Sequence, residues 1–124
     1  MDLKFYYCED CGNLVILLQN SGVPIVCCGQ KMIELVPGAV DASLEKHVPV
    51  YRTEGNRVYV SVGAAKHPMT EEHFIGWVAI QTKYGIQYVE FQPGEEPEAS
   101  FVLREGDELE AVYAVCSLHG LWKA

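Results

Sequence analysis

The stretch 112-VYAVCSLHGLWKA-124 ends an apolar run with a cysteine, a histidine and a glycine. A strand that needed only burial would stop at Val115. Cys116 and His119 are instead separated by two residues on either side of a bend, so we interpret them as groups presented to a ligand. The other cysteines and histidines of the chain decide which ligand that is.

The length of 124 residues fits one domain of ordinary size, or a small module attached to a medium one. Hydrophobic residues make up 49% of it and occur in short runs, so we expect no transmembrane helix. The net charge of −8 disfavours nucleic acid and anionic membranes as partners. The acidic N-terminus lacks the basic-then-apolar order of a signal peptide, which predicts a cytoplasmic protein.

Cysteines and histidines divide the chain into two chemically different parts. The first part carries four of the five cysteines and no histidine, whereas the second carries all four histidines and one cysteine. The segment Val36–Glu45 contains proline, glycine and small polar residues, which is typical of a linker. We therefore predict two domains, 1–37 and 38–124, with the boundary near Gly38.

The second part has a β pattern throughout, which predicts an all-β protein. In residues 57–62, Val58, Val60 and Val62 alternate with polar residues, as in a half-buried strand. We predict further strands at residues 74–82, 86–91 and 108–115, and a solvated loop at 92–101. Turn signals about ten residues apart suit a small antiparallel sandwich of about seven strands.

The first part contains CEDCG and CCG, two cysteine pairs that are each followed by glycine. An odd number of cysteines with one adjacent pair is a poor disulfide framework, so metal ligation is the better interpretation. In a C-x-x-C turn, backbone N–H groups stabilise thiolate charge and both sulfurs can face one ion. Zinc and iron both suit four thiolates, and such a closed site can fold the module or pass an electron. The ligands are Cys8, Cys11, Cys27 and Cys28.

A single histidine is more often an ordinary surface residue than a ligand, but the second part places four of them near proline or glycine. Loops at one end of a sandwich converge, so these residues can form one cluster with the last cysteine. Four imidazoles and one thiolate suit iron or copper in a square pyramid with one open position. With ferrous iron the site carries +1 and attracts a small anion. The cluster is predicted to contain His47, His67, His73, His119 and Cys116.

Taken together, the motifs CEDCG, CCG, EKHVP, HPM…EEHFI and CSLHG.W resemble those of desulfoferrodoxins, the two-iron superoxide reductases. The similarity covers essentially the whole chain. It implies a small desulforedoxin-like domain with iron bound by the four clustered cysteines. It also implies an immunoglobulin-like sandwich with a second iron, held by the four histidines as equatorial ligands and by Cys116 as the axial ligand.

The resemblance further implies a reaction, a donor and roles for two more residues. Superoxide would be reduced by one electron to hydrogen peroxide, and rubredoxin or a similar donor would restore the ferrous iron. Glu45 would ligate the oxidised iron at the sixth position, and Lys46 would guide the anion. A homodimer is expected. Ser117 departs from the family pattern, in which asparagine is more frequent, and we expect little effect because backbone N–H groups tune the sulfur.

Two alternatives come from other functional classes. The chain could be an electron carrier or structural metal module without catalysis, in which case changing the histidines to alanine would leave its activity and redox behaviour untouched. It could also be a hydrolase with Cys116 as nucleophile and His119 as base. That reading leaves three histidines unexplained.

Overall fold

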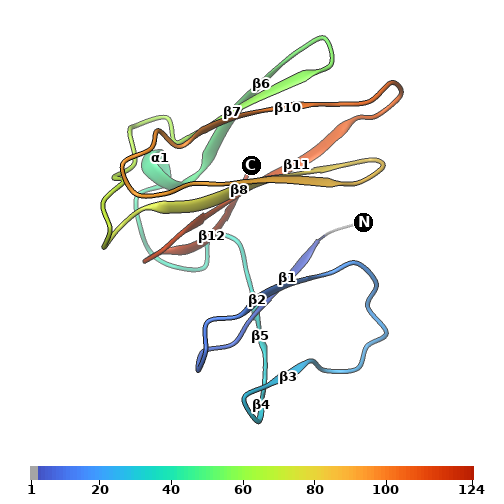
Figure 1. The fold of residues 1–124 in the computed structure, drawn as a ribbon, viewed down its shortest axis with the longest axis vertical. Coiled ribbons are helices and arrows are strands. Elements are labelled where there is room, and N and C mark those ends of the chain that lie inside the picture. Colours follow the sequence, from blue (N-terminus) through green and yellow to red (C-terminus); the bar gives the residue numbers. More distant parts are fainter. Residues whose placement is uncertain (1–2) are drawn as a thin grey trace. The chain divides into compact units, whose positions relative to one another are not determined.

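The computed structural model describes residues 3–124, which belong to two compact units. The first unit ends at Val36 and the second begins at Pro37. The regular secondary structure of both is almost entirely β-strand (Figure 1). The predicted all-β class is therefore confirmed.

The first unit contains a three-stranded antiparallel sheet in the order β2-β1-β5, formed by β1 (Lys4–Tyr7), β2 (Leu14–Leu17) and β5 (Ile33–Leu35). The short strands β3 (Val26–Cys27) and β4 (Gln30–Lys31) form a separate hairpin. The buried hydrophobic side chains of the first unit, within the described residues, are Leu3, Phe5, Cys8 and Met32. So few buried side chains make a small apolar core, and units of this size usually need a metal or disulfides for stability.

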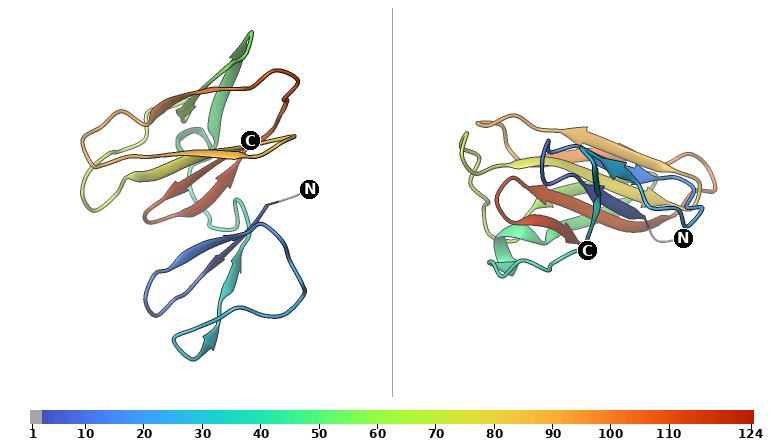
Figure 2. Two further views of the ribbon diagram at one scale, coloured as in Figure 1. Left: turned by 45° about the vertical axis from the view of Figure 1, so that its right-hand side comes forward. Right: turned by 90° about the horizontal axis from the view of Figure 1, so that it is seen from below.

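The second unit has seven strands within residues 37–124, in two antiparallel sheets. One sheet has the order β10-β7-β6, from β6 (Pro49–Glu54), β7 (Arg57–Val62) and β10 (Glu98–Val102). The other has the order β12-β11-β8-β9, from β8 (Ile75–Thr82), β9 (Ile86–Glu90), β11 (Leu109–Cys116) and β12 (Gly120–Lys123). In Figure 2 the green strands β6 and β7 lie apart from the red β11 and β12 of the other layer.

The core of the second unit lies between its two sheets. Val58, Val60 and Val62 of β7 are buried in one cluster with Val78 of β8 and Val112 of β11. The predicted alternation of β7 is correct, because Arg57 and the other polar residues of this strand face away from that cluster. The predicted seven-stranded sandwich is likewise confirmed.

The predicted solvated loop at residues 92–101 is wrong in its second half. Glu98–Val102 forms β10, which pairs antiparallel with β7. Phe101 is buried in the core, and Ala99 packs against it. The segment was assigned to a loop because two glutamates and a proline precede it. It is a short alternating strand whose inward positions are apolar.

Two further elements differ from the expectation. The predicted linker Val36–Glu45 runs into a single helical turn, α1 (Leu44–His47), although no helix was expected. The strand β6 that follows was not predicted either, and five of its six residues are exposed at the edge of the sheet. Both elements lack the apolar period that would have identified them. Among residues 3–124, no helix has the length and apolar character needed to cross a membrane.

Candidate metal centres

The four cysteines of the first unit converge on one point. Their sulfur atoms all lie within 4.8 Å of one another. Cys11 Sγ is 3.5 Å from Cys27 Sγ, and Cys27 Sγ is 4.0 Å from Cys28 Sγ. Sulfurs bound at about 2.3 Å to one tetrahedral ion lie about 3.8 Å apart. The cluster therefore has the dimensions of a four-thiolate metal centre.

Two tight turns present these sulfurs. In the first, the Gly12 N–H donates to Cys8 O, and Gly12 has a φ of 83°, which only glycine adopts without strain. In the second, Cys28 and Gly29 link β3 to β4 with φ angles of 53° and 74°. Two consecutive positive φ angles define a type I′ hairpin turn. The left-handed conformation of Cys28 thus turns its sulfur toward that of its direct neighbour.

The thiols of this cluster do not share charge equally. Hydrogen bonding from the Cys11 backbone N–H lowers the pKa of Cys8 to about 7. Hydrogen bonding with the Cys11 side chain raises the pKa of Cys27, and it raises that of Cys28 to about 12. Without a cation, the neighbouring thiols keep their protons and stabilise a single thiolate. Only a bound metal ion can hold all four groups deprotonated.

The four histidines of the second unit form a ring around a second point. Neighbouring imidazoles are nearly perpendicular, at 80–85°, and their centroids are 4.7–5.0 Å apart in the order His47, His67, His73, His119. His47 and His73 face each other across the ring at 6.1 Å. Ring nitrogens of His47, His67 and His73 lie within 4.8 Å of one another and of Cys116 Sγ. The predicted cluster of four imidazoles and one thiol is therefore assembled by the fold.

Hydrogen bonds from Nδ1 to backbone carbonyls orient two of the rings. His47 Nδ1 is 2.6 Å from Ser43 O, and His67 Nδ1 is 2.6 Å from Pro68 O. Because a carbonyl only accepts, each Nδ1 carries the proton and each Nε2 keeps its lone pair. Sequence reasoning missed these carbonyls, since a backbone acceptor leaves no trace in residue type.

The free nitrogens match the requirements of a metal ion. His67 Nε2 and His73 Nε2 are buried and have no hydrogen-bond partner among the described residues. Buried polar atoms are nearly always paired, so two at one place indicate a missing ligand. His47 Nε2 and His119 Nδ1 lie 3.0 Å apart. Two nitrogens bound at a right angle to one ion, each at about 2.1 Å, are also about 3.0 Å apart.

Burial keeps His47, His67 and His73 neutral, which is the form that binds metals. It lowers the pKa of His67 to about 4, and it lowers the pKa of His47 and His73. His67 and His47 are buried, and the other imidazoles of the ring lower these pKa values further. A positive ion can therefore bind this ring without first displacing protons at neutral pH.

The low pKa of His67 predicts that the metal-free protein loses stability in acid. Between pH 6.5 and about 4 the unfolded chain binds a proton at this residue and the folded chain does not. The free energy of unfolding therefore rises with pH across this window and falls as the pH is lowered. Urea unfolding of chelator-treated protein at about pH 7 and about pH 5 checks this. His67→Leu should show a smaller pH dependence, and equal dependence in both proteins would contradict the prediction.

Comparison with known proteins agrees with these two centres. The desulfoferrodoxin profile matches residues 39–124, and the profile of the desulfoferrodoxin N-terminal domain matches residues 2–35. The chain belongs to the desulfoferrodoxin family. The recognition made from the cysteine and histidine motifs is thereby confirmed.

Relatives of the desulfoferrodoxin family align over nearly the whole chain. A desulfoferrodoxin homolog of Archaeoglobus fulgidus is 39% identical, with 98% of this chain and 96% of the relative covered. The desulfoferrodoxin of Nitratidesulfovibrio vulgaris is 40% identical, with 98% and 94% covered. The two centres thus lie in a chain that matches desulfoferrodoxins from end to end.

Solved structures give the same picture. The superoxide reductase of Treponema pallidum superposes with a TM-score of 0.83 at 35% identity, covering 100% of this chain and 99% of that one. The one-iron superoxide reductase of Giardia intestinalis superposes with a TM-score of 0.56 at 34% identity, covering 64% of this chain and 95% of that one. The fold of this desulfoferrodoxin is therefore shared with named superoxide reductases.

The bend after β11 holds Cys116 and His119 against the rest of the ring. The indole of Trp122 stacks on His47 at 4.9 Å, and its Nε1 donates to His119 O. Cys116 Sγ lies 3.8 Å from His119 Nδ1. The Cys116 side chain is only 2% exposed, which does not suit a hydrolytic nucleophile that must reach a substrate. The hydrolase alternative also leaves the other three imidazoles around this sulfur without a role.

Glu45 and Lys46 lie in α1, directly before His47, and both side chains are exposed. The Ala65 N–H donates to Glu45 O at 2.9 Å, so a turn after β7 holds the backbone of this segment. Gly63 lies so close that a Cβ on it would be 2.5 Å from Glu45 O. Sequence reasoning missed Gly63, and its only signal was a glycine directly after an alternating strand.

We expect Gly63→Ala to displace the segment that carries Glu45, Lys46 and His47. A Cβ so close to a backbone oxygen forces a shift, and overpacking of this kind destabilises proteins by about 1–3 kcal/mol. Urea unfolding and metal content measure the effect. Gly85→Ala is the matched control, because nothing lies within 4 Å of a Cβ there. Equal stability of the two variants would contradict the assigned role.

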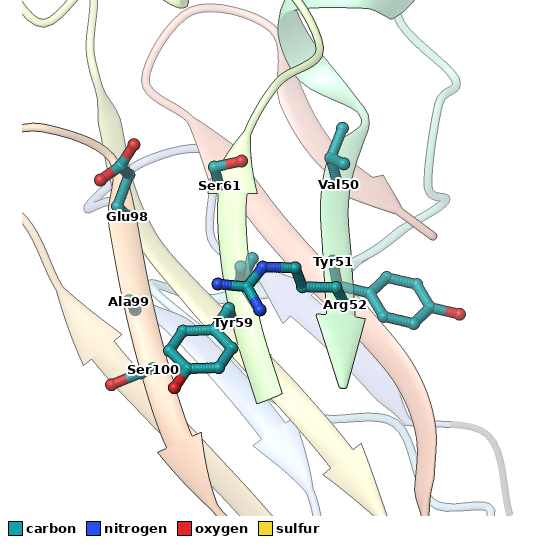
Figure 3. Close-up of a pocket in the computed structure, with 9 residues that line it drawn as sticks. Val50, Tyr51, Arg52, Tyr59, Ser61, Glu98, Ala99 and Ser100 are labelled. Atoms are coloured by element: carbon teal, nitrogen blue, oxygen red, sulfur yellow. The ribbon is translucent and has the colours of Figure 1, made fainter. Parts of the chain in front are cut away.

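A shallow cavity of about 460 Å³ lies elsewhere, on the outer face of the β10-β7-β6 sheet (Figure 3). Arg52 lies over the ring of Tyr59 at 4.1 Å and pairs with Glu54. Ser61, Glu98 and Ser100 line the other side. The cavity contains none of the nine clustered cysteines and histidines, so it is separate from the chemistry of both centres.

Proposed function

We propose that this desulfoferrodoxin is a superoxide reductase, which reduces superoxide by one electron to hydrogen peroxide at the centre formed by four histidines and Cys116. The observation that carries the proposal is the ring of four imidazoles beside the buried Cys116, with two ring nitrogens that have no hydrogen-bond partner among the described residues. The named superoxide reductases with the same fold support it.

We propose iron at both centres, one in each of the domains 1–37 and 38–124. The first iron would be bound by Cys8, Cys11, Cys27 and Cys28, and the second by His47, His67, His73, His119 and Cys116. Iron held by these residues would supply one-electron redox chemistry. Four imidazoles are neutral and one thiolate carries a single charge, so the second centre has a net charge of +1 with ferrous iron. That charge favours a small anion despite the acidity of the chain.

The residues of the chain divide the remaining work. Each imidazole presents one lone pair, while Ser43 O and Pro68 O fix the rings of His47 and His67. The Cys116 thiolate would donate electron density to a bound iron and would favour electron transfer to the substrate. Lys46 attracts superoxide through its charge, and Glu45 carries the carboxylate that would occupy the sixth position after turnover. Superoxide would gain one electron from the reduced centre and two protons from solvent, which balances to hydrogen peroxide.

We further propose a rubredoxin-like electron donor, a homodimer and residence in the cytoplasm. The five cysteines are all free, and four of them form a thiolate cluster, which suits a reducing compartment.

Pulse radiolysis of the iron-loaded, reduced protein tests the activity. A pulse of superoxide should oxidise the ferrous centre at a rate near the diffusion limit, about 10⁸–10⁹ M⁻¹ s⁻¹. One hydrogen peroxide should form for each iron oxidised. Slow or absent oxidation would leave the electron carrier or structural module as the better explanation.

Lys46 should accelerate the reaction by its charge. We expect Lys46→Met to slow the oxidation by superoxide about fivefold at low salt, the size of an exposed charge interaction. The difference should shrink at high ionic strength, because salt screens exposed charges. Lys83→Met removes the same charge at the turn between β8 and β9 and serves as the control. Equal slowing by the two changes would show that only net charge matters.

A further inference from the structure

The start of β8 is bonded in an unusual way. The strand begins at Ile75, two residues after His73. The N–H of Phe74 donates to Ser117 Oγ at 3.1 Å, and the N–H of Ile75 donates to Met69 Sδ at 3.3 Å. Two consecutive backbone donors are thus satisfied by side chains instead of by a neighbouring strand.

The two acceptors come from the other segments that carry cluster residues. Ser117 directly follows Cys116, and Met69 lies two residues after His67. The Ser117 N–H returns a bond to Phe74 O at 2.9 Å. The Ser117 N–H therefore points to a carbonyl and not to the Cys116 sulfur. From the sequence we expected backbone N–H groups near Cys116 to tune this sulfur, and the N–H of Ser117 does not do so.

Further hydrogen bonds hold the segments that carry Met69 and His73. Met69 O accepts from the Gly94 N–H at 2.7 Å, so the backbone of Met69 is held as well as its side chain. The N–H of His73 donates to Thr70 O, and the N–H of Thr70 donates to His73 O, which closes the loop between them. Strand pairing between β11 and β8 shifts its register between Val115 and Cys116. Regular pairing therefore ends where the side-chain bonds begin.

We propose that Ser117 and Met69 are positioning residues, which together fix His67, His73 and Cys116 relative to one another. This inference rests on the proposed metal centre of the second unit. Exposed serines are usually replaceable, and an ordinary strand end would explain one such bond. Here two consecutive N–H groups have different side-chain acceptors, and each acceptor belongs to a different segment with a proposed ligand. A requirement for fixed ligand geometry explains this arrangement.

Cobalt(II) bound to the full chain tests the proposal without reference to activity. The absorption that disappears in Cys116→Ser identifies the thiolate-to-cobalt band of this centre. Ser117→Ala removes the hydroxyl acceptor, and Met69→Leu keeps a similar volume without the sulfur. Ser117→Thr restores the hydroxyl. Ser100→Ala, on the exposed face of β10, is the matched control.

We expect Ser117→Ala to release cobalt to a chelator about three to ten times faster, the size of one lost hydrogen bond, and to shift the Cys116-dependent band. Met69→Leu should act in the same direction about two- to threefold, because a thioether is a weak acceptor. Ser117→Thr and Ser100→Ala should match the unchanged protein. Circular dichroism establishes that all variants are folded.

Three results would overturn the inference. First, Ser117→Ala and Met69→Leu could show the same release rates and bands as the unchanged protein. That result would remove the positioning role and leave the proposed function standing. Ser117→Thr that behaves like Ser117→Ala would show that the hydroxyl is not the relevant group. An unchanged protein without a Cys116-dependent band would overturn the proposed centre and this inference together.

Discussion

Replacing His67 by leucine is expected to remove the metal from the second unit and to leave the metal-free protein about as stable as before. His67 is fully buried, and its Nε2 has no hydrogen-bond partner among the described residues. An unpaired buried polar atom destabilises a protein by about 1–3 kcal/mol. Leucine removes that atom, but it also removes the hydrogen bond that His67 Nδ1 donates to Pro68 O, so the two effects oppose each other. The same change deletes one of the four imidazole ligands.

The magnitude of the loss follows from the role of the ligand. Mutation of groups that only support a ligand weakens metal binding about 10–100-fold, so loss of the ligand itself should weaken it at least about a hundredfold. Metal analysis after dialysis measures binding, and urea unfolding measures the stability of the chelated protein. Lys66→Ala, next in the chain and exposed, is the control. Full metal retention in His67→Leu would refute the assigned ligand.

Cys8→Ser is expected to unfold the first unit and to leave the second intact. The first unit has few buried hydrophobic side chains, and Cys8 is one of them at 4% exposure. Metal binding by four thiolates in so small a unit supplies folding free energy of about 10 kcal/mol or more. Serine does not replace a thiolate, so the unit should lose most of its stability with its metal.

Hydrogen exchange resolves the two units in one experiment. Amide protection in β1, β2 and β5 should fall by orders of magnitude in Cys8→Ser, while β8 and β11 keep theirs. Leu18→Ala, in the same unit and 70% exposed, should leave protection unchanged. If the first unit of Cys8→Ser remained protected, its stability would have to come from packing and not from metal.

The convergence of the four cysteines was predictable because their geometry is local. In CEDCG and CCG, each pair of sulfurs is brought together by a single turn, and glycine after each pair permits the positive φ that the turn requires. The strand that contains Val58, Val60 and Val62 was equally predictable, since apolar residues recur at every second position of a strand with one buried face. β10 was not, because its polar positions continue an acidic loop without a break.

The sequence by itself determined the donor atoms: four thiols in one part, four imidazoles and a fifth thiol in the other, and a β pattern to carry them. The tertiary structure decided how they meet. It brings His47 and His119 within 3.0 Å although they are 72 residues apart, and it uses Ser43 O and Pro68 O to turn the rings. Gly63 against Glu45 O and Ser117 against Phe74 are also contacts between distant segments. Such contacts depend on strand pairing and loop packing, which residue type and spacing do not encode locally.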